Sequence, residues 1–245
     1  MTLWLFISIA LLLAGPLLTL AFGKASMQGD WRTATHRSAG IAPDPAAHRE
    51  AVVQVYASRT FGWRGAFADH TWIAVKPEGA SRYTRYEVIG WYSGGGRPVI
   101  SESSQRAPDA EWYGAPPRLL RDLRGPDAQA VIARLPEALA SYPYPTEYRV
   151  WPGPNSNTFV AHVGRAIPEL RLTMPSTAIG KDYVSLREIV APSPSHTGIA
   201  VSLYGLAGVI AAWDEGLEVN VLGLVTGIDV QHPALKLPGV GRIPG

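Results

Sequence analysis

Hydrophobic and polar positions along the chain predict one long apolar helix, several strands and two shorter helices. Residues 3–22 form an uncharged apolar run of 20 residues, which spans ~30 Å as a helix, the thickness of a bilayer's hydrocarbon layer. Short apolar segments predict three strands, the last two joined by a turn at 77–80. These strands are expected at 51–56, 69–76 and 82–91. The helices are expected from Pro126, with a bend at Pro136, and over 155–166.

The C-terminal part of the chain contains a weak repeat, because residues 198–212 (GIAVSLYGLAGVIAA) align with residues 216–230 (GLEVNVLGLVTGIDV). Apolar side chains alternate in both copies, which predicts paired strands. The alternating positions are Ile199, Val201 and Leu203, and then Leu217, Val219 and Val221. A second membrane segment at 197–213 is the alternative. Prolines before it leave only about 17 residues, fewer than a spanning helix needs, so we favour strands.

Composition indicates a folded body and narrows its chemistry. The chain has 245 residues, of which 47% are hydrophobic and 17% charged, so disorder of the whole chain is excluded. Its net charge is +2, and the basic residues are scattered, so nucleic-acid binding is not expected. The absence of cysteine excludes disulfides, zinc–thiolate sites and a thiol nucleophile. Histidine spacing and glycine motifs predict neither a metal site nor a cofactor.

These patterns together predict an α+β fold, with an antiparallel sheet, one or two packed helices and one N-terminal transmembrane helix. We expect residues 1–23 to be a transmembrane anchor or a signal segment. Residues 24–49 are expected to be a linker or an arm packed on the body. Residues 50–245 would form the body, including a β-hairpin repeat at 198–230.

The N-terminal segment favours a membrane anchor over a cleaved signal peptide or a buried helix, because it lacks a basic start and a good cleavage site. The side of the membrane stays open. Basic residues after the segment (Lys24, Arg32, Arg37, Arg49) argue for a cytoplasmic body under the positive-inside rule. A single N-terminal apolar segment is also typical of exported, anchored proteins, so we favour a periplasmic body at a bacterial inner membrane.

The most unusual segment, WPGPNSNTF at 151–159, places two asparagines and a serine where a helix begins. The simplest interpretation is an N-cap, in which Asn155 or Ser156 accepts hydrogen bonds from free backbone N–H groups. The same free donors can stabilise an oxyanion, so Ser156 is also a candidate nucleophile. Asn155 and the Asn157 N–H are then candidate oxyanion or substrate contacts. A serine nucleophile still needs a base.

His70 is the candidate base, at the start of the strand over 69–76. If Glu78 and Gly79 form a two-residue loop, His70 lies opposite Glu87, with Cβ atoms ~5 Å apart. Glu87 would then orient the imidazole, although a shift of one residue would move it to the other face. Trp72 is a candidate for lining a substrate pocket. Purely structural roles for these residues are the alternative.

The strings PGPNSNTF, AIGKDY and FGWRGAFADHTWIAVK resemble an uncharacterised bacterial family known only as a domain of unknown function. This resemblance covers nearly the whole chain after residue 29 and implies no activity. More distantly, the chain is similar to permuted papain-like proteins of the NlpC-type peptidase and lecithin retinol acyltransferase kind. There, a strand histidine precedes an Asn-Cys pair at a helix N-terminus. His70 matches that histidine, Asn155 the asparagine and Ser156 the cysteine, although thiolate chemistry does not transfer to a hydroxyl.

Two functions follow from these residues and resemblances. The first is a membrane-anchored serine-dependent hydrolase or acyltransferase, in which Ser156 attacks an amide or ester, His70 is the base and Glu87 orients it. The second is a non-catalytic envelope protein of papain-like fold that binds a lipid or protein partner through the same pocket or the C-terminal hairpins. The expected partners are the membrane, through the N-terminal helix, and a small-molecule, lipid or peptide ligand.

Overall fold

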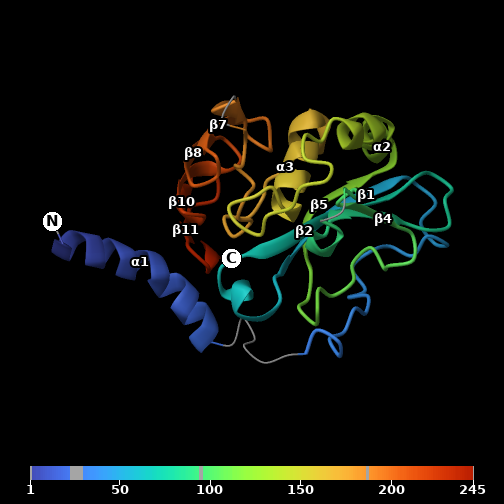
Figure 1. Cartoon of the computed structure of the whole chain (residues 1–245). Helices are drawn as coiled ribbons and strands as arrows, with labels where there is room; N and C mark the ends of the chain where they lie inside the picture. Colours follow the sequence, from blue (N-terminus) through green and yellow to red (C-terminus); the bar gives the residue numbers. More distant parts are fainter. Residues whose placement is uncertain (1, 23–29, 94–95, 186–187, 245) are drawn as a thin grey trace.

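The computed structural model describes residues 2–22, 30–93, 96–185 and 188–244. It shows a mixed α/β protein built on two antiparallel sheets, where the sequence predicted one (Figure 1). The first sheet has five strands in the order β4-β3-β2-β1-β5, and the second has seven in the order β12-β11-β10-β9-β8-β7-β6. The mixed architecture with antiparallel sheets and packed helices is confirmed.

The five-stranded sheet is buried on both faces at its central strands, β1 and β2. Its strands are β1 (Val52–Arg59), β2 (Asp69–Lys76), β3 (Thr84–Val88), β4 (Ile100–Ser103) and β5 (Arg118–Arg124). Helices α2 (Gly125–Ala140) and α3 (Ser156–Ala166) lie together on one face (Figure 1). Val55 and Ile73 point to that face, where they pack with Val131 of α2 and Phe159 of α3. The prolines at 126 and 136 both lie inside α2, which continues to Ala140.

The other face of this sheet is covered by chain segments without regular structure. Trp72 and Tyr56 point to this face, and Ile41 packs against them. The indole N–H of Trp72 donates to the carbonyl of Pro108 at 2.7 Å. The described part of the predicted arm, residues 30–49, is therefore packed on the body, and residues 24–29 lie outside the described residues. Short 3-10 helices lie at η1 (Gly62–Ala66), η2 (Gly90–Tyr92) and η3 (Pro168–Leu170).

The seven-stranded sheet is a meander in which each strand pairs with the next. Its strands are β6 (Val190–Pro192), β7 (Gly198–Leu203), β8 (Ala207–Ala212), β9 (Gly216–Val221), β10 (Leu224–Asp229), β11 (Ala234–Leu237) and β12 (Gly241–Ile243). The two repeat copies form the β7–β8 and β9–β10 hairpins, which confirms the predicted strands. A second membrane-spanning helix at 197–213 is therefore wrong. Glycines with positive φ at 205 and 223 allow the tight turns inside both hairpins.

The predicted N-terminal helix is present as α1 (Thr2–Ala21). Its C-terminal half touches the body, where the Thr19 hydroxyl reaches the carbonyl of Gly239 at 3.3 Å. A Cβ at Gly15 would collide with the Pro238 carbonyl, so glycine permits this close approach. The N-terminal half projects away from the body (Figure 1). Among the described residues, no helix meets both the length and the apolarity that crossing a membrane requires.

Candidate functional site

The predicted pairing of His70 with Glu87 is confirmed, since His70 Nε2 lies 2.8 Å from Glu87 Oε2. The register that led to this prediction is wrong by two residues, because the ladder pairs Ile73 with Tyr86. Side chains alternate between faces with a period of two, so an even shift keeps Glu87 on the face of His70. The contact survives the error in register for this reason.

Two arginines that the sequence did not single out complete this cluster. Arg85 and Arg106 each donate to the Glu87 carboxylate at 2.8 Å. Burial alone would raise the pKa of Glu87, but the hydrogen bond from His70 and the charge of Arg85 hold it at about 2. Burial lowers the pKa of His70, and its ring stacks on Trp112 with centroids 3.6 Å apart. The His70 ring is thus held between the Glu87 carboxylate and the Trp112 ring.

Trp72 does not line a substrate pocket, as was considered from the sequence. Its side chain is fully buried and stacks on Tyr56, with ring centroids 5.6 Å apart. The guanidinium of Arg85 lies over the Trp72 ring, 4.0 Å from the indole centroid. Cation–π contacts of this kind stabilise a buried arginine. Trp72 therefore supports the charged cluster around Glu87 from within the core.

Ser156 and His70 lie on opposite faces of the sheet. The strand residue that faces the start of α3 is Thr71, whose hydroxyl donates to Asn157 Oδ1 at 2.9 Å and approaches the Ser156 carbonyl at 3.3 Å. Successive side chains of a strand point to opposite faces, so His70 points away from α3, toward Trp112. The predicted contact between a serine nucleophile and a histidine base is wrong because of this one-residue offset.

The start of α3 is an N-cap in which the backbone N–H groups of Asn157 and Thr158 have acceptors. Asn155 Oδ1 accepts from the backbone N–H of Asn157 at 2.9 Å and of Thr158 at 3.2 Å. The Thr158 hydroxyl accepts in return from the Asn155 N–H at 3.1 Å, which completes a capping box. The predicted N-cap is confirmed. The predicted oxyanion donor is wrong, because the Asn157 N–H already has an acceptor.

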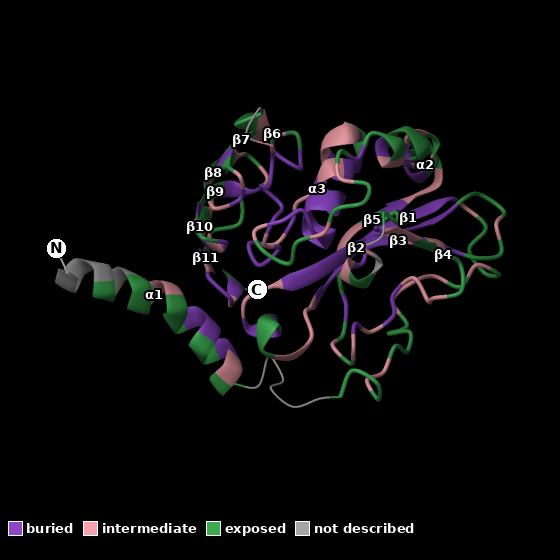
Figure 2. Ribbon diagram, viewed as in Figure 1, coloured by how far each residue is buried: buried purple, intermediate pink, exposed green. Residues whose placement is uncertain are grey.

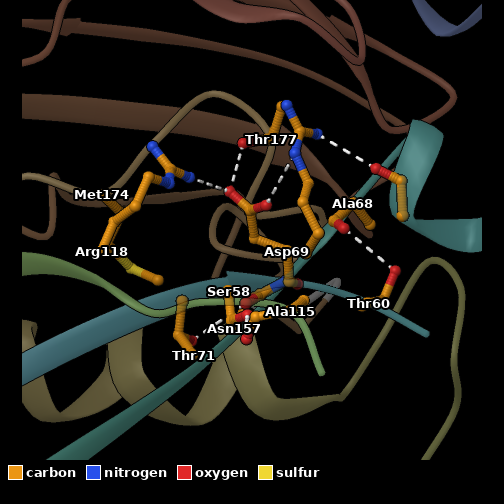
Figure 3. A network of polar contacts seen from close by, with 12 residues as sticks. Ser58, Thr60, Ala68, Asp69, Thr71, Ala115, Arg118, Asn157, Met174 and Thr177 are labelled. Carbon is orange, nitrogen blue, oxygen red and sulfur yellow. Dashed lines mark hydrogen bonds and ion pairs between the residues drawn. The ribbon is translucent and has the colours of Figure 1, made fainter. Parts of the chain in front are cut away.

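The amides of both asparagines hold three segments of chain together. Asn157 Nδ2 donates to the carbonyls of Asp69 at 3.0 Å and Ile179 at 2.8 Å, and Figure 3 shows Asn157 between Thr71 and Asp69. Asn155 Nδ2 also donates to Ile179, at 3.1 Å. A side chain at residue 180, a glycine with φ of +92°, would overlap the Asn155 amide. These side chains fix α3 to β2 and to the segment after residue 176.

Asp69 extends this network toward Arg118 and Thr177 (Figure 3). Its buried carboxylate accepts from Arg118 at 2.6 Å and from the hydroxyl of Thr177. Arg59 lies 3.6 Å away and also donates to the carbonyl of Val240, next to β12. Asp69 therefore links the five-stranded sheet to the end of the chain, which is a structural role.

A third buried carboxylate joins the seven-stranded sheet to the segment that follows α3. Glu218 of β9 lies 2.6 Å from the ammonium of Lys181 and 2.6 Å from that of Lys236. Beside it, Asn220 donates to Asp182 at 2.7 Å. Burial raises the pKa of Glu218, but the two lysine charges outweigh it and lower that pKa overall. In the sequence, Lys181 and Asp182 were noted only within the string AIGKDY. Nothing in the sequence indicated that they contact Glu218 and Asn220.

The seven-stranded sheet turns its apolar side chains outward, and this arrangement was not predicted. Val209 and Val219 face each other across β8 and β9 and are 40% and 44% exposed. Their neighbours Ile210 and Glu218 point inward and are buried. Figure 2 shows exposed segments along this wall of the molecule. Alternation in the repeat predicted two-faced strands, but it could not say which face meets the body.

Comparison with known proteins defines the class of this chain. The family described as "Protein of unknown function (DUF3750)" matches residues 50–183. This is more than half of the chain, so the protein belongs to that family. No curated protein matches the chain, and no solved structure does. The match covers the five-stranded sheet, α2, α3 and Lys181, whereas the strands from β6 onward lie beyond it. Membership of an uncharacterised family is confirmed.

Proposed function

We propose that this protein is a non-catalytic envelope protein, attached to a membrane, that binds a lipid or protein partner through its seven-stranded sheet. The observation that carries this proposal is the exposed aliphatic face of that sheet. A water-soluble domain rarely leaves so many large apolar side chains together in solvent unless they bind something. This function is the second of the two that the sequence suggested.

The geometry around Ser156 supports a non-catalytic body. A serine hydroxyl needs a base within hydrogen-bond reach, and His70 lies across the sheet from it. Thr71 occupies the strand position that faces Ser156, and a threonine hydroxyl is no base near neutral pH. A distant relationship to permuted papain-like proteins remains part of the proposal, supported by the Asn155–Ser156 helix start against a central strand.

Attachment through α1 is the second part of the proposal. Exposed apolar residues continue along this helix, including Phe6 at 68% and Leu17 at 63%. The contacts of α1 with the body that the described residues make come from Gly15, Pro16 and Thr19, and the side chains of Phe6 and Leu17 are exposed. We place the protein at a bacterial inner membrane with the body on the periplasmic side, and the cytoplasmic side is the alternative.

A serine-directed fluorophosphonate probe tests the absence of catalysis. We expect wild-type protein and Ser156→Ala to label equally or not at all, because no base activates the hydroxyl. Labelling that disappears in Ser156→Ala would contradict the proposal and restore the hydrolase. Correct folding of the variant is verified by its circular dichroism spectrum.

Flotation of the full chain with lipid vesicles tests the attachment. We expect wild type to float and the double variant Phe6→Arg/Ile9→Arg to float less, because charged side chains oppose insertion into hydrocarbon. Gln129→Arg, on the exposed side of α2, is the matched control and should float like wild type. A wild-type protein that stays with the soluble fraction would refute membrane attachment.

A further inference from the structure

We infer that the outer face of the seven-stranded sheet lies against the hydrocarbon of a lipid bilayer, as a second membrane contact beside α1. This inference rests on the proposed membrane attachment and names the partner of the exposed face. The outer face is defined as the outward side chains of β6 to β12.

The outer face carries no charge among its described residues. Its members are Val190, Pro192, Ile199, Val201, Leu203, Ala207, Val209, Ala211, Leu217, Val219, Val221, Leu224, Thr226, Ile228, Leu235, Leu237 and Ile243. Thr226 supplies the one polar side chain in this set. Sheets that face water alternate apolar-in and polar-out, so this composition is the reverse of what solvent favours.

The apolar side chains form continuous rows across the strands. One row runs through pairs of directly opposed residues: Val190, Val201, Val209, Val219 and Thr226. A second row runs in the same way: Ile199, Ala211, Leu217, Ile228, Leu235 and Ile243. Opposed side chains on one face lie within contact distance, so the rows merge into one patch rather than scattered apolar residues.

Polar contacts on the inner face explain why the sheet packs on the body in this orientation. Glu218 and Lys236 are buried there as an ion pair, and Ser202 lies beside Asn220 near Asp182. Small residues on this side allow the strands to approach the body closely, as at Gly208. The polar side chains are therefore fixed inside by specific partners. Because polar side chains occupy the inner face, the alternating apolar side chains of the same strands point outward.

The position of α1 favours a bilayer over a protein partner. Helix α1 contacts the body at Gly239, directly before β12, at one edge of the outer face. In Figure 1 it leaves the body on the side where the seven-stranded sheet forms the wall. An apolar helix and an apolar sheet face that adjoin each other can enter one hydrocarbon layer.

Tryptophans at both ends of the strands agree with a membrane surface. Trp213 follows β8 and is 66% exposed. Trp151 lies at the opposite end, where its indole N–H donates to the Leu222 carbonyl at 3.0 Å in the β9–β10 turn. Tryptophan is enriched at the boundary between lipid and water, because its ring is apolar and its N–H needs a polar partner.

The absence of cysteine makes a direct test possible. The full chain carrying Val209→Cys at the centre of the outer face is labelled with an environment-sensitive fluorophore. It is then mixed with phosphatidylcholine–phosphatidylglycerol vesicles that carry nitroxides on their acyl chains. We expect a blue shift, quenching by the nitroxides and protection from aqueous iodide. Gln129→Cys, on exposed α2, is the matched control and should show iodide quenching alone.

Three results would overturn the inference or its basis, and they can be told apart. If the labelled full chain floats with vesicles while Val209→Cys remains open to iodide, the bilayer contact is refuted and attachment through α1 stands. If the Val209→Cys label is shielded without lipid and the mass doubles, a second copy of the chain covers the face. If wild type does not float, the proposed attachment itself fails. Val219→Cys repeats the measurement in case Val209→Cys disturbs the fold.

Discussion

The two sheets of this protein bury their side chains in opposite ways. The five-stranded sheet has helices α2 and α3 on one face and the 30–49 segment on the other, so apolar residues such as Val55 and Trp72 are inside. The seven-stranded sheet buries Glu218 and exposes Val219. The first sheet is explained by its own packing. The second leaves its aliphatic side chains exposed, and the proposed bilayer contact would cover them.

Both sheets nevertheless bury a carboxylate between two cations. Glu87 lies between Arg85 and Arg106 and also pairs with His70, and Glu218 lies between Lys181 and Lys236. Removing one member of a buried pair leaves an uncompensated charge, which costs more than the pair contributes. The sequence hypothesis gave Glu87 a catalytic role, but its similarity to Glu218 indicates a structural one. The comparison can be tested from its largest effect downward.

The largest effect is expected from Glu218→Gln, which leaves two buried lysine ammoniums without a counter-ion. We expect a loss of about 3–5 kcal/mol in the free energy of unfolding, measured by urea denaturation. Glu169→Gln is the control, because its ion pair with Arg134 is exposed and should contribute under ~1 kcal/mol. Equal losses in both variants would show that the buried Glu218 cluster does not hold the seven-stranded sheet to Lys181.

Acid should destabilise the protein through Glu87. Its folded pKa of about 2 lies below the ordinary 4.5, so the folded state binds fewer protons than the unfolded state between these values. The stabilisation is present above pH 4.5 and is lost as the pH falls toward 2, by on the order of 3 kcal/mol. In Glu87→Gln, the urea midpoint of unfolding should change less with pH across this range. An unchanged pH profile in that variant would exclude Glu87 as the cause.

Asn155→Ala should cost about 1–2 kcal/mol, because it removes the cap of α3. Ser156→Ala should change the free energy of unfolding by less than ~0.5 kcal/mol, since its side chain contributes no part of the capping box. Thermal or urea unfolding of the two variants separates these roles. A larger cost at Ser156 than at Asn155 would contradict the structural interpretation of the motif.

The smallest effect is expected on the outer face. Val219→Thr should change stability by less than ~0.5 kcal/mol, because its side chain is already in contact with solvent. The same substitution at Val55, buried in the five-stranded sheet, places a hydroxyl in the core and should cost about 1–3 kcal/mol. Similar losses at both positions would mean that the outer face is covered in the isolated protein.

Local patterns in the sequence determined much of the secondary structure. The strand over Asp69–Lys76, the cap at Asn155 and the repeat hairpins were all predicted, because alternation, capping chemistry and turn glycines act over a few residues. Even the contact between His70 and Glu87 followed from alternation, despite the wrong register. Arg106 was missed because it lies on a separate loop, whereas Arg85 lies two residues before Glu87 on β3, so alternation could have indicated it.

Only the tertiary structure decided which face of each strand meets which neighbour. Thr71, and not His70, faces Ser156, because α3 packs on the side of β2 that carries Ile73. Likewise, Glu218 points inward because its partners lie on that side. These partners are Lys181 and Lys236, which are 37 and 18 residues away in sequence. Alternation gives a strand two different faces but does not determine which of them packs on the body. Packing against distant chain segments decides this, and the exposed aliphatic face of the second sheet results from that choice.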